Sequence, residues 1–593
     1  MTGVRRVVLP ALVAIAFGFA LLLARRAQAG GVVTNCANDT DLSAKLAGGG
    51  TITFSCGTAT IILNSEKAIT ANTTIDGGGS IALSGGNTNR LFSVSSGVTL
   101  TLKNIVLTNG YAEADGGAIV NSGHLVLDHT TIQNSQTTSP WSGGAILTTG
   151  PLDITDSVLA NNKAGNGGAI YPRFANAHVT ISNSELHDNQ TTNTSNGWGG
   201  AILVWDGATV TIDRSDLHNN AARNGGAIYN HLADSSITLS DTKLRDNQAL
   251  QFVGGGIFNE GTASLARITV SGNTAISGGG IDNETGGTLM LTDSTLSGNH
   301  AISSWGGGFS NHGGTATVSN VTFSGNDATE GGGFANLNSG TATLTNVTMT
   351  ANSSHEPDQG GGIFNDAQTS VRNVALAGNT NLNCNLFPTS PFQSSQFNLS
   401  TDGSCNFGAG RDNIPDMKLG PLADNGGPTL TQMPAADSPV VDAGTGTGCP
   451  STDQRGAPRP AGAACDVGAV EFGSSLPTPT PSPSPTPSPT HSATATPTAT
   501  PTGGAHHKQG DLDCNNVIDG RDALRPLRAA AGVPEDQPGG CPALDAGTPD
   551  FADVNCDGAI GPPDTIAIEQ FAAGVAIQPA PPPGCTAIGQ LLS

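Results

Sequence analysis

The sequence predicts an all-β protein whose main body is a right-handed parallel β-helix, a solenoid in which each turn of the chain stacks on the turn before it. Short apolar–polar segments recur with a period near 27 residues, and Gly, Thr, Asn and Ser dominate a composition with only 12% charged and 4% aromatic residues. Two matching acidic loops near the C-terminus indicate a separate small module. Since 593 residues are too many for one compact core, we divide the chain into residues 1–29, 30–418, 419–472, 473–509 and 510–593.

Residues 1–29 have the pattern of a secretion signal. Arg5-Arg6 precedes an apolar run over residues 7–23, and Ala27-Gln28-Ala29 supplies a small-x-small cleavage site. The alternative is an uncleaved membrane anchor, because the run nearly spans a bilayer and is followed by Arg25-Arg26. We favour cleavage, with no membrane span after it, and a secreted protein that is free or attached to the cell surface.

The chain is strongly acidic. Its formal net charge is -23, and removal of the signal with its four Arg makes this -27, or 47 acidic residues against 20 basic ones. Such a surface repels phosphate backbones, which argues against nucleic acid as a partner, and it suits cation binding.

Ten cysteines form five close pairs behind the secretion signal, which favours local disulfides over free thiols or zinc ligands. Spacing alone does not fix their connectivity. The expected pairs are Cys36 with Cys56, Cys384 with Cys405, Cys449 with Cys465, Cys514 with Cys541, and Cys556 with Cys585.

One half of the repeat reads apolar-x-Asp/Asn-x-x-apolar-x-x-Asn. Its last Asn recurs every 26 or 27 residues with one interval of 31, and we expect these side chains to form a hydrogen-bonded ladder inside a corner of the solenoid. They are Asn162, Asn189, Asn220, Asn247, Asn273, Asn299, Asn326, Asn352 and Asn379.

The other half is a Gly-Gly-Ala-Ile or Gly-Gly-Gly-Ile/Phe signature set in a strand-like alternation of apolar and polar residues. We predict about twelve coils between residues 50 and 400. One interior file would contain Ile119, Ile146, Ile170, Ile202, Ile228, Ile257 and Ile281.

Two stretches carry a family resemblance. Ile69–Gly110 resembles the opening coils of pectate-lyase-like β-helix proteins, and Ser271–Asn283 resembles the repeats of polymorphic outer-membrane-type proteins. The resemblance covers roughly residues 50–400 and implies the fold. It leaves activity open, because this fold hosts lyases, hydrolases, adhesins and passive stalks.

Two further segments follow the repeats. Residues 419–472 contain "DNGGPTLTQ", "SPVVDAG", "DQRGAPRP" and "CDVGAVEF", and they resemble the choice-of-anchor Q domain, which implies a C-terminal cap. Residues 473–509 are rich in Pro, Thr and Ser, a composition typical of an extended, semi-rigid linker.

The C-terminal module contains two 12-residue loops, "DLDCNNVIDGRD" and "DVNCDGAIGPPD", each with acidic or amide side chains at the positions that surround calcium in helix–loop sites. Each loop precedes a helix-compatible run, so the duplication resembles a dockerin and implies a cohesin-like or other scaffold partner. The recognition positions depart from that family, with Gly520-Arg521 and Pro562-Pro563. The expected ligands are Asp511, Asp513, Asn515, the Val517 carbonyl, Asp519 and Asp522, and then Asp553, Asn555, Asp557, the Ala559 carbonyl and Asp564.

The solenoid sequence shows no catalytic constellation, and its catalytic residues, if any, stay unknown. Asp and Asn exchange at one repeat position, which indicates turn chemistry. Three of the four Trp, namely Trp141, Trp198 and Trp305, lie four or five residues before the interior file, where exposed rings would stack on sugars. The alternative is that each Trp only covers a loop.

Two functions therefore remain open. The favoured one is a non-catalytic surface or adhesive protein that binds a glycan and is attached through the calcium-binding module. The other is a polysaccharide lyase or glycoside hydrolase docked through the same module. The sequence leaves the ligand undetermined.

The duplicated acidic loops predict that the C-terminal module binds two calcium ions. We expect the module to be less ordered without them, because the carboxylates repel one another when they are not neutralised. Asp511→Ala and Asp553→Ala should each remove one site in a calorimetric titration. A chain that takes up no calcium, or whose melting temperature is unchanged by chelator, would contradict this prediction.

Overall fold

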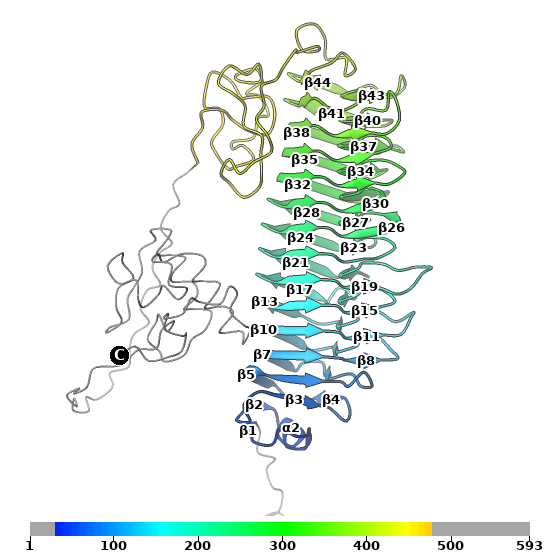
Figure 1. The fold of residues 1–593 in the computed structure, drawn as a ribbon, viewed down its shortest axis with the longest axis vertical. Coiled ribbons are helices and arrows are strands. Elements are labelled where there is room, and N and C mark those ends of the chain that lie inside the picture. Colours follow the sequence, from blue (N-terminus) through cyan, green and yellow to red (C-terminus); the bar gives the residue numbers. More distant parts are fainter. Residues whose placement is uncertain (1–29, 477–593) are drawn as a thin grey trace, which may run out of the picture. The chain divides into compact units, whose positions relative to one another are not determined.

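The computed structural model describes residues 30–476, and it confirms the predicted parallel β-helix (Figure 1). One wall is a 13-stranded sheet, so the solenoid has about thirteen turns, close to the twelve expected. Its strands are β4 (Lys67–Ile69), β6 (Phe92–Val94), β9 (Ile119–Asn121), β12 (Ile146–Thr148), β16 (Ile170–Pro172), β20 (Ile202–Val204), β23 (Ile228–Asn230), β27 (Ile257–Asn259), β31 (Ile281–Glu284), β34 (Phe309–His312), β37 (Phe334–Leu337), β40 (Ile363–Asn365) and β43 (Cys384–Leu386).

A larger sheet of 23 strands forms the opposite wall, and many of its strands are bent in the middle. It contains β1 (Gly31–Val33), β2 (Gly50–Phe54), β3 (Ala59–Ile62), β5 (Thr73–Ser84), β7 (Thr99–Thr108), β10 (His124–Gln133), β13 (Leu152–Thr155), β14 (Val158–Ala160), β17 (His178–Ser182), β18 (Glu185–His187), β21 (Thr209–Asp213), β22 (Asp216–His218), β24 (Ser236–Ser240), β25 (Lys243–Arg245), β28 (Thr262–Ala266), β29 (Thr269–Ser271), β32 (Thr288–Ser297), β35 (Thr315–Ser324), β38 (Thr341–Thr350), β41 (Gln368–Arg372), β42 (Ala375–Ala377), β44 (Ser394–Gln396) and β45 (Leu399–Ser400).

Two short sheets join these walls along a third side. One contains β8 (Tyr111–Ala112), β11 (Gln136–Thr137), β15 (Lys163–Ala164) and β19 (Gln190–Thr191). The other contains β26 (Gln248–Val253), β30 (Thr274–Ser277), β33 (His300–Ala301), β36 (Asp327–Ala328) and β39 (Ser353–Ser354).

The predicted interior file of Ile side chains is confirmed. Ile119, Ile146, Ile170, Ile202, Ile228, Ile257 and Ile281 pair in parallel register from coil to coil, and each is 0% exposed. Each coil therefore packs its large apolar side chain on the equivalent side chain of the next coil.

The predicted asparagine ladder is also present. From Asn162 to Asn352, each side-chain Nδ2 donates to Oδ1 of the next Asn at 2.9–3.0 Å, and the backbone N–H of the same residue donates to that oxygen. The remaining Nδ2 hydrogen of Asn273 goes to the Leu244 carbonyl at 2.9 Å. These contacts satisfy polar groups that would otherwise destabilise the core.

The Asp/Asn exchange position is a turn, as the sequence indicated. Asp156, Asn183, Asp241 and Asn320 all have φ between 48° and 54°, the left-handed region that Asp and Asn tolerate best. The same turn bends the long strands β7, β32, β35 and β38, at Asn104, Asp293, Asn320 and Asn346.

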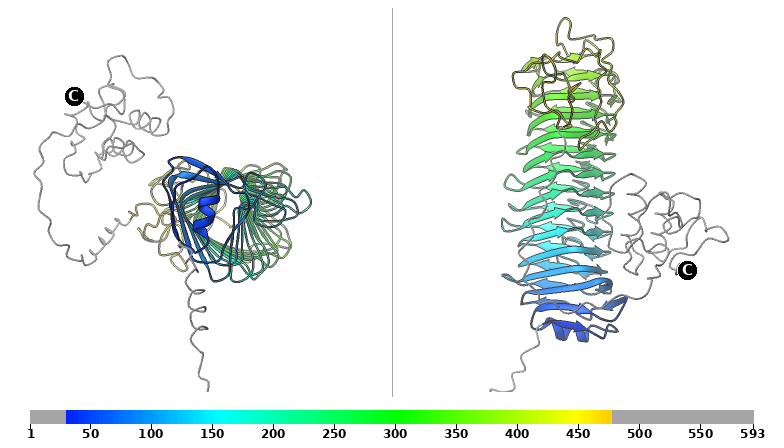
Figure 2. Two further views of the ribbon diagram at one scale, coloured as in Figure 1. Left: turned by 90° about the horizontal axis from the view of Figure 1, so that it is seen from below. Right: turned by 90° about the vertical axis from the view of Figure 1, so that its left-hand side faces the viewer.

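The N-terminal end is closed by α2 (Thr40–Leu46), which lies across the mouth of the first coils (Figure 2). Its Leu42 is fully buried, and a disulfide joins Cys36 to Cys56 beside it.

Three of the five predicted disulfides are present in the described part of the chain. Besides the N-terminal one, a disulfide joins Cys384 to Cys405 where the coils end, and another joins Cys449 to Cys465 in the segment that follows. The other two stay predictions. The expected bond of Cys514 with Cys541 lies outside the described residues, and so does the expected bond of Cys556 with Cys585.

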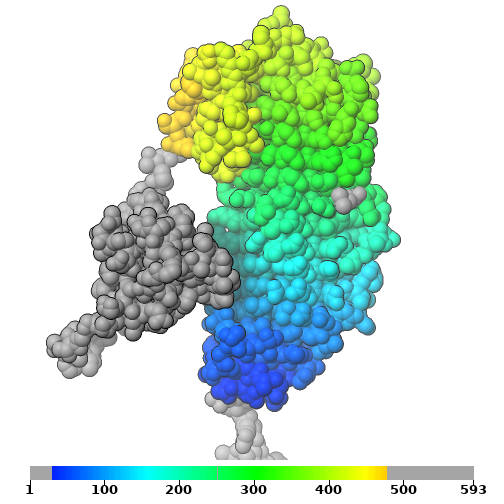
Figure 3. All heavy atoms as spheres, in the orientation of Figure 1, coloured from blue at the N-terminus to red at the C-terminus, as the bar shows by residue number. Residues whose placement is uncertain are grey.

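Residues 413–476 pack along the flank of the coils that contain β32, β35 and β38 (Figure 3). Gln454 Nε2 donates to Thr295 Oγ1 at 2.9 Å, and Thr322 Oγ1 donates to Gln454 Oε1 at 2.7 Å. Asn346 Nδ2 donates to the carbonyls of Asp466 and Gly468. The segment therefore covers the bend of these coils through a set of buried polar contacts.

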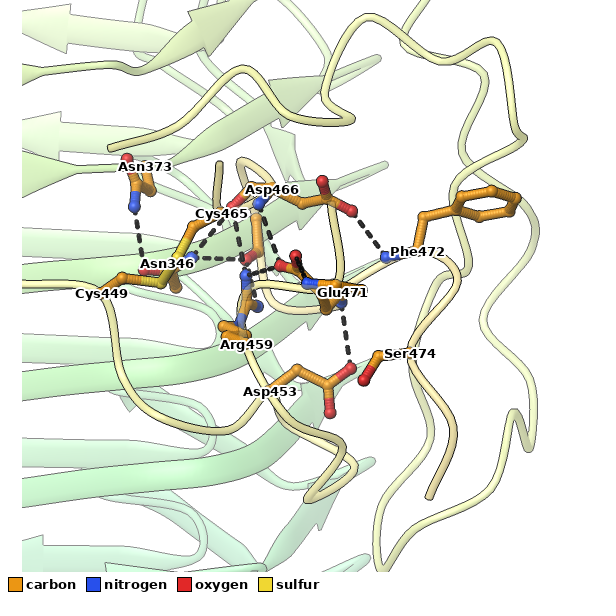
Figure 4. Close-up of polar contacts among 12 residues, drawn as sticks. Asn346, Asn373, Cys449, Asp453, Arg459, Cys465, Asp466, Glu471, Phe472 and Ser474 are labelled. Carbon is orange, nitrogen blue, oxygen red and sulfur yellow. Dashed lines mark hydrogen bonds and ion pairs between the residues drawn. A yellow bond between two sulfur atoms is a disulfide. The ribbon is translucent and has the colours of Figure 1, made fainter. Parts of the chain in front are cut away.

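The buried charges of this tail hold it together (Figure 4). Arg459 and Glu471, at 0% and 1% side-chain exposure, pair at 3.0 Å. Arg455 pairs with Asp453 at 2.7 Å, and Asp453 also accepts the backbone N–H of Glu471. These motif residues are therefore structural, since both carboxylates are engaged within the tail.

Replacing one rung of the asparagine ladder tests its contribution. Asn273→Ala removes the acceptor for Asn247 and two donated hydrogen bonds, so we expect a loss of about 1–3 kcal/mol in unfolding free energy. Urea denaturation followed by circular dichroism measures it. Asn176→Ala, at an exposed position, is the control, and equal midpoints for the two variants would refute the role of the ladder.

Candidate functional site

The outer face of the 13-stranded sheet carries an unusual strip of side chains, built from three rows. The middle row follows the interior file by one residue and points outward because strand residues alternate. The leading row lies four residues before the file, and the trailing row lies three residues after it. We call the part of these rows between β16 and β37 the outer strip; it contains Tyr171, Trp198, Leu203, Trp205, Tyr229, His231, Phe258, Glu260, Asp282, Glu284, Trp305, Ser310, His312 and Glu330.

The N-terminal half of the outer strip is aromatic. Trp198 and Trp205 stack with ring centroids 5.3 Å apart, and Trp205 lies 4.0 Å from the His231 ring. The Tyr229 ring is nearly perpendicular to that of Trp198, and it also contacts the rings of His231, at 5.1 Å, and Phe258, at 4.7 Å. The middle row is buried although it points outward, because the Trp side chains cover it while staying half-exposed themselves.

The other half of the strip contains carboxylates, each held by a partner. Tyr229 Oη donates to Glu260 at 2.8 Å, and His231 Nδ1 contacts the same oxygen. One coil further on, His312 Nδ1 lies 2.9 Å from both oxygens of Glu284.

Hydrogen bonding controls the charge of these two carboxyl groups. Burial is the largest single influence on Glu260 and Glu284 and opposes their ionisation. The hydrogen bonds that each carboxyl accepts, including those from His231 and Tyr229 or from His312 and Thr285, outweigh it together with the charge of the histidine, so the pKa of each carboxyl falls below its ordinary value. The same contact raises the pKa of His312. Two anionic groups thus lie one coil apart, about 4.8 Å along the axis.

Asp282 is the exception among these acids. It is 1% exposed, and it occupies the middle row between Phe258 and Ser310. Its Oδ1 has no hydrogen-bond partner within the described chain, and neither has the Ser310 hydroxyl. Burial, reinforced by the charge of Glu284, raises the pKa of Asp282 to about 7, so this carboxyl exchanges its proton near neutrality.

The three Trp residues singled out from the sequence have different positions. Trp198 and Trp305 share the leading row. The backbone of Trp198 forms a parallel β-bridge with Asn224 in the next coil, and that of Trp305 forms one with Glu330. The Trp305 side chain also donates from Nε1 to Glu330 at 2.8 Å. In the coil of Trp141 the equivalent residue is Ser142, and the Trp141 side chain is 42% exposed beside the row.

Sequence reasoning did not single out Trp205, His231, Asp282 or Glu284. The available signal was their offset from the interior file, since residues at one offset in successive coils lie side by side. The expected calcium ligands, in residues 511–522 and 553–564, lie outside the described residues.

Two hollows occur elsewhere on the described surface. One, of about 680 Å³, follows the bend of the 23-stranded sheet and is lined by Asp156, Asn183, Arg214, Asp241 and their neighbours. The other, of about 440 Å³, lies over the loop at residues 190–194. Neither is lined by an aromatic ring, so the outer strip is the stronger candidate for a ligand site.

Comparison with known proteins gives one match that supports the fold. Residues 131–301 match the family model described as "right handed beta helix region". The crystal structure of pectate lyase Pel9A aligns with a TM-score of 0.28 at 15% identity, covering 71% of this chain and 87% of that one. No curated protein matches the sequence. Within residues 30–476, no helix has the length and apolar character needed to cross a membrane.

Asp282 predicts a characteristic pH dependence of stability. Because its pKa is raised by folding, the folded state binds the proton more tightly, and stability falls as pH rises from about 4 to about 7. Asp282→Asn should therefore be more stable than the natural protein by roughly a few kcal/mol at pH 8 and by almost nothing near pH 4.

Thermal unfolding across this pH range measures the difference. Asp234→Asn, which removes an exposed acid of the same size, is the matched control for the loss of one negative charge. A stability difference for Asp282→Asn that is independent of pH would contradict the assignment.

Proposed function

We propose that this protein is a secreted or cell-surface β-helix protein that binds a polysaccharide chain lengthwise along the outer strip. The observation that carries the proposal is the half-exposed Trp198–Trp205–His231 stack, with Trp305 in the same row four coils away. Four coils correspond to ~19 Å, a length that spans several sugar units.

The chemistry of the strip suits a carbohydrate. Half-exposed indole rings offer flat apolar faces for sugar rings, and the neighbouring carboxylates, imidazoles and the Trp305–Glu330 pair offer hydrogen-bonding groups for hydroxyls. These groups are preorganised, because each is already held by a neighbour in the next coil. Binding therefore needs little ordering of side chains.

The charge of the strip favours a neutral chain. Glu260, Glu284 and Glu330 are acidic, and the whole chain has a net charge of -23. Uronate polymers would be repelled, whereas a neutral polysaccharide would not. We therefore infer a neutral glycan as the ligand class.

Cleavage of the bound chain is the second candidate function. The specific observation is Asp282, a carboxyl that can carry a proton near neutrality, flanked by the ionised Glu260 and Glu284. Glycoside hydrolysis uses one protonated and one ionised carboxyl group. Because Asp282 is 1% exposed, binding without cleavage is the better supported function.

Attachment is proposed from the sequence. The secretion signal would direct the solenoid out of the cell, and the two acidic loops would bind calcium and fold a dockerin-like module that docks to a cohesin-like or other scaffold protein. The Pro-rich linker would hold the solenoid away from that attachment point.

Substitution of the tryptophans tests glycan binding. Trp198→Ala, Trp205→Ala and Trp305→Ala should each weaken binding of a neutral polysaccharide such as galactomannan or xyloglucan by roughly tenfold, ~1.4 kcal/mol, as measured by affinity electrophoresis. Phe397→Ala, which removes an exposed ring from the other wall, should leave binding unchanged. Polygalacturonate should bind more weakly than the neutral chains.

The same mixtures distinguish the two candidate functions. Release of new reducing ends that is lost in Glu284→Gln would establish cleavage. Absence of binding to every neutral chain, or full binding by Trp198→Ala, would refute the outer strip as a glycan site.

A further inference from the structure

A cluster of two histidines and one aspartate lies outside the outer strip, on the five-stranded short sheet. His300, Asp327 and Ser353 begin β33, β36 and β39 and pair in register, so they stack in three successive coils. His355 follows Ser353 by two residues and returns toward the same point. The solenoid repeat thus brings together side chains that are 27 and 28 residues apart.

Both imidazoles converge on one oxygen atom. His300 Nδ1 lies 2.7 Å from Asp327 Oδ2, and His355 Nε2 lies 2.8 Å from the same atom. The three atoms that could bind a metal ion, one from each side chain, all lie within 4.8 Å of one another. The Ser353 hydroxyl donates to the other oxygen, Oδ1, and so fixes the orientation of the carboxylate.

We propose that His300, Asp327 and His355 form a binding site for a zinc ion. Two imidazole nitrogens and a carboxylate oxygen are ligands that zinc prefers. A tetrahedral ion with bonds of ~2.1 Å spaces its ligand atoms about 3.4 Å apart, so each imidazole nitrogen would move outward from Asp327 Oδ2 by roughly half an ångström to admit the ion. The side chains are 30–46% exposed, so an ion can reach them and water can take the fourth position. Ser353 supplies the outer hydrogen bond typical of such sites.

The arrangement differs from the ordinary His–acid pairs on this surface. His124 pairs with Asp153 at 2.7 Å, and His187 pairs with Asp188 at 2.6 Å, each with a single imidazole. Among the described residues, Asp327 is the carboxylate that receives two imidazoles on one oxygen. The cluster Asp128–His129–Asp156 has one imidazole and two carboxylates, a set less suited to zinc.

A zinc ion at this position would connect three neighbouring loops of the solenoid. His300, Asp327 and His355 each stand a few residues before a member of the leading row, namely Trp305, Glu330 and Gln359. A zinc ion would fasten the starts of these three loops to one another. It would thereby stiffen one edge of the solenoid, whether or not a glycan binds there.

Titration of the full-length protein with zinc chloride, after saturation with calcium to fill the acidic loops, tests the site. The natural protein should bind one more zinc ion than His300→Ala or His355→Ala, and zinc should raise its melting temperature but not theirs. Ser353→Ala should bind that ion about tenfold more weakly, because the carboxylate loses its outer hydrogen bond.

His124→Ala is the matched control and should behave like the natural protein. Both His300 and His355 are substantially exposed, so their replacement leaves the core intact, and circular dichroism of the metal-free variants checks this. Equal zinc stoichiometry and affinity in the natural protein and in His355→Ala would overturn the proposal, as would zinc uptake that is absent at pH 7.5.

Discussion

The structure depends on strict in-register stacking of one coil on the next, and the asparagine ladder is the interaction that enforces it. A buried amide is destabilising unless both its donor and its acceptor are paired, and here each Asn is satisfied only when the next coil places its own Asn at the same height. A slip by one residue would leave several buried amides without partners. The apolar file alone would tolerate such errors far better, since dispersion contacts have little directionality.

This constraint turns positions in the repeat into rows in space, and the outer strip follows from it. Tyr229, Phe258 and Asp282 are neighbours because they share an offset from the interior file, although 24 or more residues separate them along the chain. The scaffold also tolerates an unfavourable residue such as Asp282, because each coil interacts mainly with its two neighbours and the remaining coils stay in place. An ionisable group can therefore be buried at the site without loss of the fold.

Much of the fold could be predicted from the sequence, because residues one repeat apart in the chain lie next to each other in adjacent coils. The Ile119–Ile281 file and the ladder from Asn162 to Asn379 followed from spacing, and the three disulfides within residues 30–476 join close cysteine pairs that were expected to bond. A second buried ladder through Asn230, Asn259, Asn283 and Asn311 was missed, although it lies two residues after the same file.

The outer strip was predicted only in part. Trp198 and Trp305 stand out in the sequence because Trp is rare, whereas the burial of Asp282 depends on which side chains cover it. The flank position of residues 413–476 could not be deduced, because it depends on polar contacts such as that of Gln454 with Thr295, which no periodic pattern records.

The one-residue-per-coil construction of the outer strip has an evolutionary consequence. Duplication or deletion of one coil between β23 and β34 would leave the interior file and both ladders continuous, since these coils share an apolar residue in the file and an Asn in each ladder. It would, however, change the separation of Trp198 and Trp305 by ~4.8 Å in one step. The distance between the two tryptophans can therefore change by one coil at a time through mutations that are neutral for folding. Natural selection can in this way alter which ligand the surface fits without altering the fold.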